Sequence, residues 1–143
     1  MKYNKKIRLF ANFVIPLALG ALFYYLLSPN TLFVHELDEL TDHAIRQQIS
    51  IENNLILKFV RNYLLDMFWA YALVMFLFLI IDHNAAGLWK SLWIAFLFST
   101  GMEILQLLPF LKGTFDVWDI LAELLAELIA ILVISVFLRG EQK

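Results

Sequence analysis

The sequence predicts an all-α membrane protein with four transmembrane helices and an amphipathic outer helix between the first and second spans. Hydrophobic residues make up 62% of the 143 residues, and the mean hydropathy is +0.74. Both values are far above those of soluble domains, which are roughly half apolar. Four runs also reach the length of about 20 apolar residues that a transmembrane helix needs. We therefore interpret residues 1–143 as a single integral membrane domain in contact with the lipid bilayer.

The four apolar runs differ in how they begin and end. They cover about residues 9–27, 60–81, 88–110 and 117–138. The first is too long for a signal-peptide core and is followed by no small-residue cleavage site, so we expect it to be retained, with a kink at Pro16. Pro109 ends the third run, and Gly113 lies in the short turn that makes the third and fourth helices antiparallel neighbours.

Residues 28–59 form the one long loop of this arrangement. An apolar face at helical spacing predicts an amphipathic helix on the outer surface, and it comprises Phe33, Leu37, Leu40 and Ala44. Ser50 is placed to cap a helix that runs into the second span. His35, Glu39 and His43 share a face as metal ligands would, but this pattern is weak, and we favour a solvated face over a metal site.

The distribution of lysine and arginine predicts the orientation. Seven of these residues lie at the termini or in the turn of residues 82–90, and four lie on the other side. Because cytoplasmic loops carry the excess of positive charge, both termini are expected in the cytoplasm of a cell membrane. The net charge of −2 gives no reason to expect a nucleic-acid partner, and the absence of cysteine excludes disulfides and cysteine zinc sites.

Carboxylates concentrate in the fourth run, where hydrocarbon should dominate. Asp116, Asp119, Glu123 and Glu127 lie within roughly 80° of one another on a helix of 3.6 residues per turn. Ionised side chains in a membrane cost at least ~2.5 kcal/mol each at the helix centre, which makes them functional candidates by default. Either Glu123 or Glu127 should be protonated, or a cation or basic group should lie beside them.

Two other runs bring polar groups to a similar depth. Glu103 and Gln106 share a face of the third span, which Ser99 extends inward, and Asp66 lies near the outer end of the second. We therefore predict an acidic pocket that opens to the outside, with no metal assigned to it. Its binding residues are Asp66, Glu103, Gln106, Lys112, Asp116, Asp119 and Glu123. The alternative is that these groups only hold the helices together by hydrogen bonds.

Other polar and aromatic residues in the spans have simpler interpretations. Trp89, Trp93 and Trp118 lie near span ends, where tryptophan commonly anchors a helix at the membrane interface. Asn12 lies inside the first span, and we expect it to serve helix packing.

The runs E-I-L-Q and G-T-F-D-V-W-D-I-L-A-E resemble the signature of VanZ-like membrane proteins. The matching positions are Glu103, Gln106, Asp116 and Asp119, and the stretch around Asp66 and Trp69 is similar to a helix start in that family. Many members have an arginine in the turn where this chain offers Lys112, and they have Asn and Gly where it has Glu123, Ala126 and Ala130. The resemblance implies a link to low-level resistance to teicoplanin-type glycopeptides, without naming a reaction.

Three functions follow as expectations. The first is a cell-envelope protein whose acidic pocket binds an envelope lipid, another amphiphile or a glycopeptide. The second is an intramembrane enzyme on a lipid-linked substrate, with Asp119 or Glu123 as general acid or base. The third is a small proton- or cation-coupled transporter, which would need to form a homo-oligomer because four spans are few for transport.

Overall fold

The computed structural model describes residues 3–27, 55–81, 83–108 and 115–139. All regular elements in these ranges are helical, and they are α1 (Tyr3–Leu27), α3 (Leu55–Phe59), η1 (Val60–Leu64), α4 (Leu65–Ile80), α5 (Ala85–Leu105) and α6 (Val117–Arg139). The predicted amphipathic helix and the His35, Glu39 and His43 set lie outside the described ranges.

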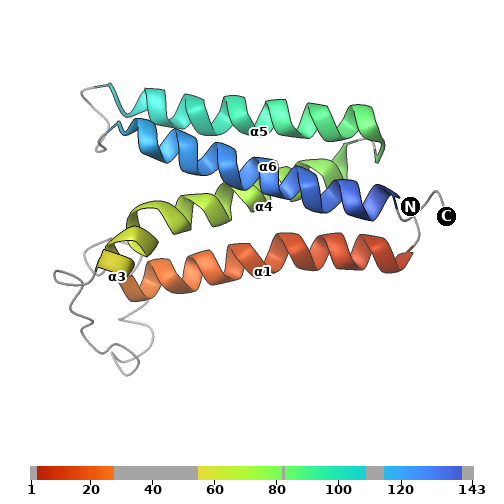
Figure 1. Cartoon of the computed structure of the whole chain (residues 1–143), viewed down its shortest axis with the longest axis horizontal. Helices are drawn as coiled ribbons and strands as arrows, with labels where there is room; N and C mark the ends of the chain where they lie inside the picture. Colours follow the sequence, from red (N-terminus) through yellow and green to blue (C-terminus); the bar gives the residue numbers. More distant parts are fainter. Residues whose placement is uncertain (1–2, 28–54, 82, 109–114, 140–143) are drawn as a thin grey trace.

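The helices form an antiparallel bundle in which α4 occupies the middle (Figure 1). It packs against α1 on one side and against α5 and α6 on the other, and α5 also packs against α6. The start of α1 and the end of α6 lie at the same end of the bundle. We call this the terminal end. The opposite end, where α1 and α5 finish and α6 begins, is called the loop end.

The second span begins earlier than predicted. It is one stretch from Leu55 to Ile80 that contains α3, η1 and α4, whereas the predicted span starts at residue 60. Val60–Leu64 form a π-helical turn. Such turns are rare, and they occur mostly as single turns within α-helices, frequently at functional sites. This one ends two residues before Asp66.

The third span is shorter than predicted at its end. Asn84 caps its start, because its side-chain Oδ1 accepts a 2.8 Å hydrogen bond from the Gly87 amide. The helix finishes at Leu105, and residues 106–108 continue in tighter turns in which each amide binds the carbonyl three residues earlier. A proline disfavours the helical conformation of the residue before it, so Pro109 in the sequence favours an end of the helix near this point.

The first helix contacts α4 through paired side chains along its length. The Tyr71 hydroxyl donates a 3.2 Å hydrogen bond to Oδ1 of Asn12, which confirms the packing role expected for Asn12. Phe23 stacks on Phe68 with ring centroids 6.4 Å apart. A Cβ on Gly20 would lie 3.4 Å from the Cβ of Phe68, so the missing side chain lets the two helices approach closely here. The helix runs unbroken through Pro16.

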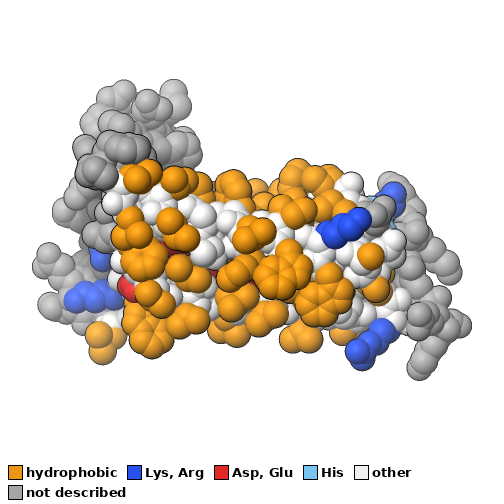
Figure 2. Space-filling view, turned by 90° about the horizontal axis from the view of Figure 1, so that it is seen from above, with side chains coloured by type: hydrophobic (Ala, Val, Ile, Leu, Met, Phe, Trp, Pro, Cys, Tyr) orange, Lys and Arg blue, Asp and Glu red, His pale blue; other side chains and the backbone are white. Residues whose placement is uncertain are grey.

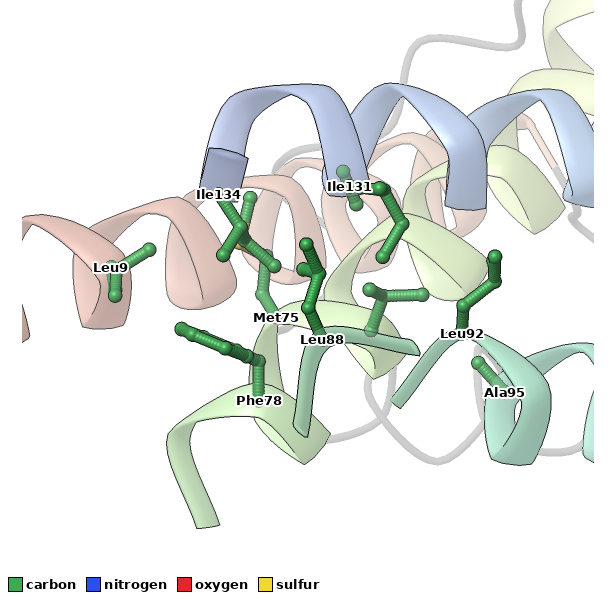
Figure 3. Packing of buried hydrophobic residues seen from close by; sticks show 10 residues of the cluster. Leu9, Met75, Phe78, Leu88, Leu92, Ala95, Ile131 and Ile134 are labelled. Atoms are coloured by element: carbon green, nitrogen blue, oxygen red, sulfur yellow. The ribbon is translucent and has the colours of Figure 1, made fainter. Parts of the chain in front are cut away.

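The hydrophobic core fills the terminal end of the bundle (Figure 3). All four long helices contribute to it, and its members include Leu9, Phe78, Leu92 and Ile134. Burial of such side chains stabilises a fold by about 1.5–3 kcal/mol each relative to exposure. The packing therefore anchors the bundle at the end that carries no acidic cluster.

The outer surface of the bundle is apolar over most of its length. Figure 2 shows hydrophobic side chains across the middle of one face, with lysines and arginines at the two ends. Trp69, Trp89, Trp93 and Trp118 are all exposed on the bundle surface. Four helices are long and apolar enough to cross a membrane. An exposed apolar belt between charged ends is what a bilayer would cover.

Candidate functional site

The polar side chains of the span interiors gather in the half of the bundle nearer the loop end. Glu103 comes from α5, Glu123 and Glu127 come from α6, and their exposed fractions are only 7%, 6% and 0%. Buried glutamates in three such positions are unusual, because acidic side chains are almost never fully buried unless they are paired. We call these three residues, with Asp66 and Asp119, the acidic cluster.

Glu103 is held by Gln106, the residue that follows the last residue of its own helix. The Gln106 amide nitrogen donates a 2.7 Å hydrogen bond to Oε1 of Glu103. The spacing of three residues places both side chains on one helix face, as the sequence predicts. The other oxygen, Oε2, is buried and has no hydrogen-bond partner within the described structure.

Glu127 joins α6 to α5. The Ser99 hydroxyl lies 3.0 Å from Oε1 of Glu127 and donates to it, and it lies 3.3 Å from the carbonyl of Phe96. Ser99 is itself 2% exposed. Oε2 of Glu127 is buried without a partner among the described residues, as is the Thr100 hydroxyl beside Ser99.

Glu123 lies between Glu127 and the rest of the acidic cluster. Its carboxylate lies near enough to Asp66, Glu103, Glu127 and Asp119 for like-charge repulsion. Its Oε2 is also buried and unpartnered in the described part of the chain. A buried oxygen without a hydrogen bond costs about 1–3 kcal/mol. Each of the three glutamates therefore has one carboxyl oxygen to which no described side chain forms a hydrogen bond.

Two aspartates form the more exposed rim of this cluster. Asp66 on α4 and Asp119 on α6 are both partly buried, and each interacts electrostatically with the other and with Glu103. The structure thus brings together Asp66, Glu103, Gln106, Asp119 and Glu123 from three helices, the group that sequence spacing placed at one depth.

Asp116 forms hydrogen bonds with the backbone at the start of α6. Its Oδ1 accepts a 2.9 Å hydrogen bond from the Trp118 amide, and its carbonyl accepts one of 3.2 Å from the Asp119 amide. Both contacts are those of an N-cap residue, which satisfies the free amides of the first helical turn. We therefore assign Asp116 to the start of α6. Lys112 lies outside the described residues.

No basic side chain with a described position enters the cluster. Lys6, Arg8, Lys58, Arg61, Lys90 and Arg139 are all exposed. The described residues contain no group of three or more acidic or histidine side chains arranged to hold a metal ion. The acidic cluster is therefore without an internal countercharge among these residues, and it favours a ligand that carries a positive charge or hydrogen-bond donors.

Glu127, Ser99 and Thr100 extend the cluster beyond the predicted binding residues. A sequence signal existed for two of them, because Glu127 continues the spacing of the α6 carboxylates and Ser99 lies four residues before Glu103. Thr100 lies three residues before Glu103, a spacing that also places the two on one face of a helix, but the sequence interpretation did not include it. The acidic cluster is therefore deeper than the predicted pocket.

Two open hollows flank the cluster. One, of about 300 Å³, lies between α1 and α4 and has Asp66 among its lining residues. The other, of about 390 Å³, lies between the second span and α6 and is lined by apolar and aromatic residues that include Tyr63, Trp118 and Ala122. Asp66 is the only carboxylate that lines either of these two hollows.

Comparison with models of known protein families, with curated proteins and with solved structures finds no match for this chain.

Proposed function

We propose that this chain is a VanZ-like protein of the cell membrane that binds an envelope amphiphile or a glycopeptide through a cationic or donor-rich group at the acidic cluster. One observation carries the proposal, namely the buried Oε2 atoms of Glu103, Glu123 and Glu127, which have no hydrogen-bond partner among the described residues. Within low-dielectric surroundings such acceptors attract a donor or a positive charge far more strongly than they would in water.

The resemblance of residues 103–119 to VanZ-like proteins supports the envelope setting of the proposal, and so does the apolar belt of the bundle. The four potential membrane spans alternate in direction, so the termini share one side. The excess of lysine and arginine on that side favours the cytoplasm. The acidic cluster then lies in the outer half of the membrane, where an envelope ligand would arrive.

The test is the teicoplanin susceptibility of a sensitive bacterium that expresses the full chain, compared with Glu103→Gln and Asp119→Asn variants. The amides keep shape and most hydrogen-bonding capacity but remove charge. We expect the wild-type chain to raise the inhibitory concentration and each amide variant to lose this effect while still accumulating in the membrane. Equal protection by all three proteins would contradict the proposal.

A proton- or cation-coupled transporter is the second candidate, because Glu127 continues the carboxylate series one helical turn deeper than Glu123 and is bound by Ser99. Series of acidic side chains within membrane spans form proton relays in pumps and transporters. Reconstituted vesicles with a pH-sensitive dye distinguish the two functions. A pH-gradient decay that depends on both Glu123 and Glu127 would favour transport over binding alone.

A further inference from the structure

The hollow between α1 and α4 has the shape and chemistry of a lateral entrance to the acidic cluster. Its walls are apolar side chains that include Leu17, Ala21, Phe68 and Trp69, and the carboxyl-bearing side chain of Asp66 completes them. An apolar lining with a single convergent charged group is the usual composition of a small-molecule site. This composition suits a ligand with an alkyl part and one polar end.

Gly20 helps to define the hollow. It lines the space at a point where α1 packs close to α4, since a Cβ at this position would lie in van der Waals contact with the Cβ of Phe68, at 3.4 Å. Without a side chain, residue 20 places no bulk in the hollow. Ala21, the next residue, also lines the hollow and is exposed. The small residues of α1 thus keep open the side of α4 on which Asp66 lies.

Asp66 connects the hollow with the buried glutamates. Its carboxylate repels those of Asp119 and Glu103, and Glu123 in turn is affected by Asp66. A cation that reaches Asp66 is therefore attracted by several carboxylates at once. The described lysines and arginines, which are all exposed, do not supply that charge.

We propose that the hollow admits a single-chain alkylammonium amphiphile, with its ammonium group on Asp66 and its chain against α1 and α4. The inference deepens the proposed function and rests on it. The volume of about 300 Å³ is at the lower limit for small-molecule pockets, and it suits an ammonium and the adjoining part of one chain better than a whole glycopeptide. The ligand class is thereby an amine-bearing amphiphile delivered from the membrane.

The experiment uses the full chain in lipid nanodiscs and a dodecylammonium probe that carries a photoreactive diazirine on its chain. Labelled positions are mapped by mass spectrometry, and unlabelled dodecylammonium or dodecanol is added as competitor. We expect labels on Pro16–Tyr24 and Leu65–Trp69, with competition by the ammonium and not by the alcohol. Ala21→Trp should fill the hollow, and Asp66→Asn should remove the charge.

Either variant should weaken the apparent affinity of the probe by roughly 30-fold or more. Asp66→Asn removes one partner of a buried charge pair, and Ala21→Trp blocks access to that partner. Ala122→Trp is the matched control, because it places the same bulk in the second hollow, and it should label like the wild type. Thermal unfolding of each variant in the nanodisc shows whether the bundle remains folded. If Ala21→Trp fails to fold, Ala21→Leu repeats the test with less bulk.

The outcomes separate the two proposals. Labels outside the hollow between α1 and α4 that depend on Glu103 and persist in Ala21→Trp would overturn the inference that the hollow is the entrance. They would leave the acidic cluster as the binding site. Labels in the hollow that dodecanol displaces equally well would show a lipid-chain groove without an ammonium site, which also overturns the inference. Labelling that is unaffected by Asp66→Asn, Glu103→Gln and Glu123→Gln would overturn the inference and the proposed function together.

Discussion

The Ser99 hydroxyl on α5 donates a 3.0 Å hydrogen bond to Oε1 of Glu127 on α6, and both side chains are buried. Glu127 lies near the middle of α6 and Ser99 lies in the last third of α5, so the bond fixes the rotation of one helix against the other. It satisfies only one of the two glutamate oxygens, because Oε2 has no partner in the described structure. The contact therefore positions Glu127 without completing its hydrogen bonding.

Removing this donor should destabilise the bundle. In Ser99→Ala, Glu127 loses the hydrogen bond to Oε1, and we expect a loss of about 1–3 kcal/mol in the free energy of unfolding. Reversible unfolding in mixed micelles, followed by circular dichroism, measures the change. Ser91→Ala is a matched control, since within the described part of the chain the Ser91 hydroxyl donates only to the Gly87 carbonyl of its own helix, at 2.9 Å. A smaller loss for Ser99→Ala than for Ser91→Ala would argue against the interhelical bond.

Replacing the glutamate should have the opposite effect on stability. Glu127→Met has a similar shape and removes the unpartnered oxygen, and the Ser99 hydroxyl still has the Phe96 carbonyl as acceptor. We expect a gain of about 1–3 kcal/mol in unfolding free energy, the cost that the unsatisfied group imposes. A gain in stability accompanied by loss of the teicoplanin phenotype would identify Glu127 as functional, as in other trade-offs between stability and activity. A destabilised variant would contradict the prediction.

The start of α6 should depend on hydrogen bonding at residue 116 rather than on its charge. Asparagine caps a helix about as well as aspartate, whereas alanine costs about 0.5–2 kcal/mol. Asp116→Asn should therefore unfold like the wild type, and Asp116→Ala should be less stable by that amount in the same micelle assay. Equal loss in both variants would show that the charge of Asp116, and not its capping bond to Trp118, is what matters.

The orientation can be tested with introduced thiols, because the chain has no cysteine of its own. Asn54→Cys and Gln142→Cys are made separately, and intact cells are treated with a membrane-impermeant thiol reagent. With both termini in the cytoplasm, position 54 should be labelled and position 142 should not. Labelling of position 142 alone would invert the orientation and would place the acidic cluster in the inner half of the membrane.

The sequence was sufficient to predict the helices and the convergence of the acids, but not the finer geometry. Length and hydropathy predicted all four long helices, and the fourth is predicted to within one residue at its end. Periodicity placed Glu103 and Gln106 on one face. The first and second helical stretches begin earlier than their predicted apolar runs, at Tyr3 and Leu55, because polar residues that flank an apolar run can still be helical. The third helix ends at Leu105, before its predicted end at residue 110, because the apolar run continues past the end of the regular helix.

Asp116 shows why the site could not be predicted completely. An aspartate three residues before another on a helix has the same spacing whether it caps the helix or binds a ligand, and the capping bond to the Trp118 amide is seen only in the folded backbone. A part of Asp116 in ligand binding stays a prediction. The depth of the acidic cluster likewise depends on how far α5 and α6 are rotated toward each other. That rotation arises from packing between helices and is not encoded in the spacing along either one.

The π-helical turn at Val60–Leu64 lets the second span accommodate one extra residue within an otherwise α-helical stretch. Deleting one residue there converts the turn to an α-helical one, and the first five residues of the span keep nearly the same rotation relative to α4, because the wider turn holds the extra residue. The packed part of α4, with Asp66 on it, would keep its place. Differences in the length of the chain that enters this span can thus be absorbed before they reach the acidic cluster.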